Sequence, residues 1–130
     1  MYPAHRAEIT DDAAWPAVVA DIVAQQQASQ PFVYPSGLIE IPMSPVSDVT
    51  AFRAHQWKLD QFLEAIKAAV TWTIDRGAVF DFLAHPSCLY VTDPEFRTID
   101  MICDLVRKSP DKAEFANLDR IAQRVAESRL

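Results

Sequence analysis

The sequence predicts an α/β fold in which four helices alternate with about three parallel strands along 130 residues. Apolar residues recur at helical spacing in four segments, and short apolar runs bounded by proline or glycine lie between them. Such alternation is typical of parallel strands joined by helical crossovers. Because a closed barrel needs about eight strands, three strands predict either a small open sheet or part of a larger fold.

The first two helices are expected in the N-terminal half of the chain. Apolar spacing predicts one over 10–28, with Thr10 as its N-cap and Pro16 near the first turn, where proline is tolerated. The longest helix is expected over 54–76. Gly77 follows directly, and glycine is the residue that most often ends a helix in the left-handed conformation.

The other two helices are marked by their first residues. Asp93-Pro94 predicts a helix with an aspartate cap and a proline in the first position. Asn117 is expected to cap the last helix, whose apolar face is carried by four residues: Leu118, Ile121, Ala122 and Val125.

The strands are expected between these helices. Residues 37–42 read as a short strand that Pro42 stops, and a stiff loop over 43–48 follows it. Residues 78–85 read as a buried strand, and 112–116 as a weaker one. The whole chain, 1–130, is therefore predicted to be one domain.

Composition and charge exclude several classes of function. Half of the residues are hydrophobic, so a packed core is expected, while the net charge of −6 argues against nucleic-acid binding and against a polybasic membrane surface. No apolar run reaches the length of a membrane span, and the N-terminus has no apolar signal core. The two cysteines show no CxxC spacing. A cytoplasmic protein is the expectation.

His85 is the leading catalytic candidate. It ends the apolar strand expected over 78–85 and is followed by Pro86. The carboxyl ends of strands carry the active sites of α/β folds, and an imidazole there can transfer protons near neutral pH. The alternative is a structural histidine that hydrogen-bonds a loop carbonyl, and position alone does not separate the two.

Asp48 ends the loop after the first strand, and its carboxylate could orient a catalytic partner or bind a sugar hydroxyl. Its spacing favours the simpler interpretation, an N-cap for the next helix. Trp57 follows that loop and is the best of the three tryptophans for stacking on a sugar, although a tryptophan at a helical position is more often part of the core.

The remaining polar groups define no further site. Glu40 and Asp81 interrupt apolar runs, either facing a barrel interior or marking the solvent side of edge strands. No HxxxH or HExxH pair is present, and no Asp-Asp pair follows a strand, so a metal site within this chain is not expected.

Three stretches resemble the later part of polysaccharide deacetylases, the chitooligosaccharide-deacetylase homology domain. They are residues 34–48 with Glu40-Ile41-Pro42 and Asp48, then Phe52-Arg53 and Trp57; Phe80-Asp81-Phe82-Leu83-Ala84-His85-Pro86-Ser87, then Asp93-Pro94; and residues 113–122. Together they cover most of the chain after about residue 30. The resemblance implies that 1–130 is the C-terminal part of a distorted (β/α)7-type barrel, a single incomplete domain.

The resemblance also implies a chemistry. The family removes acetyl groups from N-acetylated sugars in carbohydrate metabolism, using a divalent metal, zinc foremost, whose ligands lie in the N-terminal half of the domain. His85 matches the histidine that protonates the leaving amine, and Asp48 resembles a position that supports it or contacts substrate. Because the early Asp-Asp and HxxxH motifs are absent here, the chain alone is expected to be inactive.

Three hypotheses therefore stay open. The first is a hydrolase of non-peptide C–N bonds that acts on an acetylated amino sugar or a related small amide. It would act either as a homodimer or with a complementing N-terminal half. The second is a non-catalytic α/β binding module, and the third is a degenerate barrel fragment that retains only a sugar-binding groove.

Overall fold

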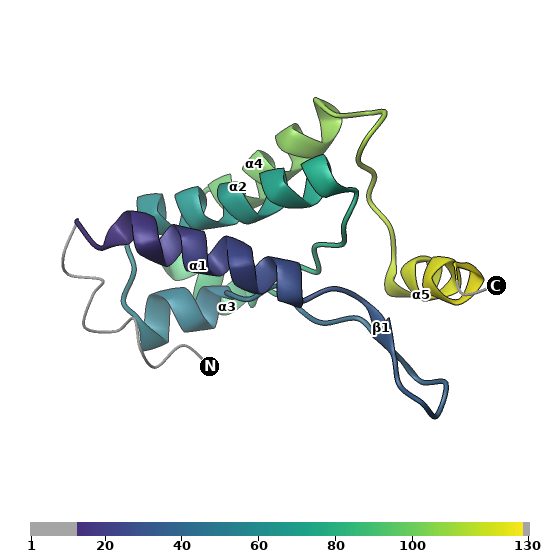
Figure 1. Cartoon of the computed structure of the whole chain (residues 1–130). Helices are drawn as coiled ribbons and strands as arrows, with labels where there is room; N and C mark the ends of the chain where they lie inside the picture. Colours follow the sequence, from purple (N-terminus) through teal and green to yellow (C-terminus); the bar gives the residue numbers. More distant parts are fainter. Residues whose placement is uncertain (1–12, 129–130) are drawn as a thin grey trace.

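The computed structural model describes residues 13–128 and shows a mainly helical molecule with a small amount of strand. Three long helices form its body: α1 (Trp15–Ala28), α2 (Leu59–Arg76) and α4 (Arg97–Arg107). α2 lies in the middle, because it packs against α1 on one side and α4 on the other (Figure 1). No described helix has the length and apolar character of a membrane span.

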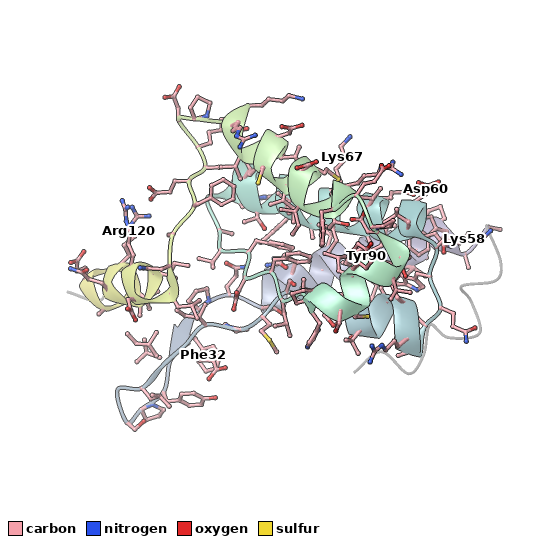
Figure 2. The ribbon with its side chains drawn as sticks, turned by 180° about the vertical axis from the view of Figure 1, so that it is seen from behind. Phe32, Lys58, Asp60, Lys67, Tyr90 and Arg120 are labelled. Carbon is pink, nitrogen blue, oxygen red and sulfur yellow. The ribbon has the colours of Figure 1, made fainter. Side chains whose placement is uncertain are left out.

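A narrow hairpin leaves the body after α1. Its strands β1 (Phe32–Val33) and β2 (Ile39–Glu40) pair antiparallel, with Phe32 opposite Glu40. The turn between them contains Gly37 with φ near 90°, a conformation that side-chain-bearing residues avoid. Figure 2 shows Phe32 on this hairpin, away from the helical body.

Three shorter helices complete the chain. A π-helix, η2 (Val49–Ala54), precedes α2, and α3 (Pro86–Thr92) lies between the residue 78–84 segment and α4. The last helix, α5 (Leu118–Glu127), is joined to α4 by a long extended segment and lies apart from the other helices (Figure 1). None of its residues is buried, so the core is built by the rest of the molecule.

The core fills the space around α2. This helix presents its apolar face to both neighbours, as its sequence spacing predicts. The buried apolar side chains are Trp15, Val18, Ile22, Val46, Ala51, Trp57, Phe62, Ala65, Ile66, Ala69, Val70 and Leu89. The loop before η2 therefore belongs to the core as much as the helices do.

The expected parallel sheet is absent from the described residues, and this corrects the prediction of a parallel barrel fragment. The strand expected over 37–42 shrinks to two residues and pairs antiparallel with β1, a pairing that the sequence pattern does not indicate. Neither 78–85 nor 112–116 forms a strand: 78–85 and 113–116 have no regular secondary structure, and Lys112 lies in a turn. A strand exists only where a second backbone lies beside it, and no described backbone pairs with these two.

The ends of the helices follow the sequence signals more closely than the strands do. Gly77 ends α2 with φ near 61°, and Asn117 caps α5 by accepting a hydrogen bond from the Arg120 N–H. Pro16 lies in the first turn of α1, whereas the Thr10 cap falls outside the described residues. Asp93 accepts hydrogen bonds at the start of α4, although that helix begins four residues later.

Among residues 13–128, two residues other than glycine adopt the left-handed conformation. They are Gln56, just before α2, and Phe96, just before α4, with φ near 54° and 52°. Side-chain-bearing residues pay roughly 1–2 kcal/mol there. The chain has only two glycines, so these corners are made without one.

Candidate functional site

Asp48 and His85 are brought together from two separate segments. Asp48 immediately precedes η2, and His85 ends the extended segment 78–84 and precedes Pro86, the first residue of α3. The His85 Nδ1 atom lies 2.9 Å from Oδ1 of Asp48. The backbone N–H of His85 also donates to Oδ2 of Asp48 at 2.8 Å. One carboxylate therefore fixes both the backbone and the ring of the histidine.

Asp48 is fully buried and acts as an acceptor on both oxygens. Besides the two groups of His85, the Val49 N–H donates to its Oδ1 at 2.9 Å. An ionised carboxylate can only accept, so Nδ1 of His85 carries the hydrogen in this pair. The tautomer of neutral His85 that results has its lone pair on Nε2. Asp48 thus caps η2, as its spacing favoured, and orients His85 as well.

The outer edge of the imidazole remains accessible. The His85 side chain is 48% exposed, while Asp48 beneath it is 0% exposed. A histidine held at Nδ1 by a buried carboxylate can accept a proton at Nε2 and return it to another group. The pair is therefore suited to transfer a proton to or from a molecule that approaches from solvent.

Trp57 lies in the core beside this region. Its side chain is 6% exposed, and its ring meets Trp15 edge-on with centroids 5.0 Å apart. Trp15 in turn donates its indole N–H to Glu64 at 2.8 Å. Stacking on a sugar requires an open indole face, so a substrate role for Trp57 stays a prediction that this packing does not favour.

Asp81 and Glu40 lie on different segments of the chain. Asp81 lies on the extended segment 78–84, and its partial burial raises the pKa of its carboxyl above the ordinary value of 3.8. Its backbone C=O accepts the Ser44 N–H at 2.7 Å, which ties the segment to the loop after β2. Glu40 lies on the hairpin, in β2.

Gln26 and Gln30 form hydrogen bonds to the backbone of Val79 that the sequence did not predict. Gln26 lies at the C-terminal end of α1, and Gln30 lies just beyond it. Gln26 is buried and donates its Nε2 hydrogen to the Val79 C=O at 2.9 Å. Gln30 donates to the same carbonyl at 3.0 Å and accepts the Val79 N–H at 2.8 Å. Their spacing of four residues brings both amides to one side of the chain, which was the available signal.

A metal does not fit the described residues. In 13–128, no three side chains of His, Cys, Asp or Glu gather closely enough to hold an ion. The Asp48–His85 pair supplies only two such side chains, and both Asp48 oxygens already accept hydrogen bonds. A bound divalent ion needs several ligands around it, so the pair is not a metal centre by itself.

A cavity of about 450 Å³ lies elsewhere in the molecule, and neither Asp48 nor His85 lines it. Its walls come from the C-terminal ends of α2 and α4, from residues 77–80 and from the segment that leads to α5. Sequence reasoning did not anticipate it. The chain therefore presents two separate features, a hydrogen-bonded Asp48–His85 pair and a cavity.

No family model, curated protein or solved structure matches the chain.

Proposed function

We propose that this chain supplies the proton-transferring part of a hydrolase site for a non-peptide C–N bond, that of an N-acetylated amino sugar. His85 is the group that protonates the leaving amine, and Asp48 is its positioning residue. The observation that carries the proposal is the 2.9 Å contact between the buried Asp48 carboxylate and Nδ1 of the half-exposed His85. The sequence resemblance to polysaccharide deacetylases supports the same assignment.

The chemistry requires a proton at the nitrogen. When water adds to the acetyl carbonyl, the C–N bond of the tetrahedral intermediate breaks only if nitrogen leaves as an amine rather than as an amide anion. Protonated His85 donates the Nε2 hydrogen to this nitrogen while Nδ1–H stays bound to Asp48. The carboxylate keeps the ring in place and holds the hydrogen on Nδ1, the role of the aspartate in hydrolase triads.

The metal that the resemblance implies belongs to a segment outside residues 13–128, because these residues do not assemble its ligands. The proposal therefore assigns activity to a complete site, formed when this chain is joined to, or associates with, a polypeptide that carries the metal ligands.

The test is acetate release from acetylated chitooligosaccharides in the presence of zinc. It compares the chain alone with a version extended upstream, each with the native residue or with His85→Ala. We expect activity in the extended version and a loss of about 10²–10⁴-fold in its His85→Ala variant. Asp48→Asn should also lower kcat, because it replaces the carboxylate that holds Nδ1 of His85. Asp75→Asn, which removes an exposed carboxylate, is the matched control.

Unchanged activity of the extended His85→Ala variant would refute the assigned role. Silence of both versions would favour the second candidate, a non-catalytic binding module. The observation on its side is the cavity, which neither Asp48 nor His85 lines.

A further inference from the structure

The segment 78–84 makes most of its backbone hydrogen bonds along one edge. The Val79 N–H and C=O bond to Gln26 and Gln30, the Asp81 C=O accepts from Ser44, and the His85 N–H donates to Asp48. In an extended chain, residues two apart direct their backbone groups to the same side. These three odd-numbered residues therefore point to the side occupied by α1 and the 44–48 loop.

The opposite edge is open beyond the Ala78 N–H, which donates to the Thr73 C=O of α2 at 3.0 Å. Within the part of the chain that the structure describes, the backbone N–H and C=O groups of Phe80 and Phe82 have no hydrogen-bond partner, and neither does the Ala78 C=O. These even-numbered residues direct their backbone groups away from α1. The segment thus bonds through alternate residues, as a strand paired along one edge does, and leaves Phe80 and Phe82 available on the other.

A second open backbone lies across the cavity. Glu114, Phe115 and Ala116 are extended, and none of their backbone groups bonds to another described residue. Their orientation is nevertheless fixed, because the Glu114 carboxylate binds Arg120 at 3.3 Å and also Arg124, both on α5. Figure 2 shows Arg120 on the side of α5 that the incoming segment approaches. Phe115 is 61% exposed.

The cavity joins these two edges. Residues 78–80 form one wall and residues 110–116 the other, and the two segments run along the same side of the molecule (Figure 1). The floor is apolar and comes from Val70 and Ile74 of α2 and from Ile102 and Val106 of α4. At the mouth the charges balance, with Asp111 and Glu114 against Lys112 and Arg124. An apolar occupant therefore meets no uncompensated charge at the mouth.

We propose that this cleft receives an extended strand from a separate polypeptide, which pairs with the open edge of 78–82 and covers Phe115. Strand addition fits both walls, because each offers backbone donors and acceptors that only another backbone can satisfy in series. A small apolar ligand would leave them unbonded. A second copy is disfavoured, because both copies carry a net charge of −6 and each adds Asp81 and Glu114 to the interface.

The incoming strand is therefore uncharged or basic, with apolar residues at alternate positions. This inference concerns binding and does not depend on the proposed chemistry. Loss of one would leave the other intact, because no residue of the Asp48–His85 pair lines the cleft.

The test uses the whole chain and two synthetic peptides. The probe is an acetylated hexapeptide of alternating valine and lysine, and the control is the same peptide N-methylated at alternate residues, which cannot donate along one edge. Main-chain hydrogen bonds supply most of the affinity in strand addition, so a generic sequence suffices. We expect the probe at millimolar concentration to slow amide hydrogen exchange of Phe80, Phe82 and residues 114–116 by about tenfold or more, with no effect from the control.

A variant pair makes the assignment local. Phe115→Ala should weaken binding of the probe by about tenfold, because exposed aromatic anchors carry much of the energy of such contacts. Leu118→Ala removes a comparably exposed apolar side chain that does not line the cleft and should leave binding unchanged. Slow exchange of these amides in the free chain would overturn the proposal in favour of pairing between copies. Equal protection by both peptides, or by neither, would also overturn it.

Discussion

Asp48 and His85, 37 positions apart in sequence, are joined by two hydrogen bonds to the same carboxylate, one from the ring and one from the backbone of the histidine. The backbone bond has a consequence for stability. It makes the buried aspartate a structural link between the η2 region and the segment that precedes α3. Asp48 therefore has a role in folding that does not depend on the chemistry of His85.

Removing either partner of this pair should have unequal effects on stability. Asp48→Ala leaves the N–H groups of Val49 and His85 without their acceptor and should lower the free energy of unfolding by roughly 2–4 kcal/mol. His85→Ala removes one ring contact from a half-exposed side chain and should cost less than about 1.5 kcal/mol. Urea unfolding measures both values. Equal costs would mean that the backbone bond contributes little.

Asp81 should make stability depend on pH. Desolvation raises its pKa in the folded state above 3.8, so the folded chain retains this proton over a pH range in which the unfolded chain loses it. The contribution of Asp81 to stability is therefore highest below pH 3.8 and falls as the pH rises through its folded pKa. Asp81→Asn should stabilise the chain at neutral pH relative to the native sequence, with a smaller difference at about pH 3, below the unfolded pKa. Urea melts at both pH values test this sign, and Asp75→Asn serves as the exposed control. A difference that grows on acidification would contradict the burial argument.

Gly77 offers a test of backbone strain free of packing effects. A Cβ atom added there meets no atom within 4 Å, yet the residue keeps a left-handed φ of 61°. Gly77→Ala should therefore destabilise the chain by about 1 kcal/mol through conformation alone. Thermal unfolding would show this as a lowered Tm, with Ala78→Gly as a comparison at a neighbouring position. An unchanged Tm would indicate that the end of α2 relaxes to another conformation.

Trp57 should behave as a core residue with one unfavourable group. Its indole Nε1 is buried and has no hydrogen-bond partner in the described structure. Trp57→Phe keeps most of the apolar volume and removes that donor, so its cost should be limited to roughly 1–2 kcal/mol. Trp57→Ala should cost roughly 3–5 kcal/mol. If Trp57→Phe instead left stability unchanged and abolished sugar binding, the ring would have to be accessible to substrate.

The sequence predicts the local features of this fold better than its pairing. The helical spacing of α2 and the caps at Gly77 and Asn117 depend on residues close together in the chain, and the structure contains them. Strand pairing depends on a distant backbone, and no local pattern in 78–85 indicates whether one is present. The η2 and α3 helices were missed because they are short and lie in segments that proline and polar residues make look like loops.

The candidate site, like the fold, was predictable from the sequence only in part. His85, at the end of an apolar segment, was a catalytic candidate, and Asp48, at the end of the loop over 43–48, was favoured as a helix cap. Their hydrogen bond was not predicted, because it depends on how two loops fold over the core. Gln26 and Gln30 escaped notice because their amides satisfy a backbone rather than a substrate. The cavity depends on where the segment leading to α5 runs, and that path has no signal in sequence spacing.

The length of the segment between Val79 and His85 determines where the imidazole lies. Val79 is clamped by Gln26 and Gln30 at one end, and His85 meets Asp48 six residues later on the same side of the chain. Along an extended backbone, the N–H and C=O groups of successive residues point to opposite sides. An insertion or deletion of one residue between Val79 and His85 would therefore turn the His85 N–H away from the Asp48 carboxylate. A change of two residues would keep the His85 N–H on the same side and alter only the distance that the segment spans. The number of residues between Val79 and His85 can therefore change only by two at a time if the bond to Asp48 is kept, whatever the side chains of these residues are.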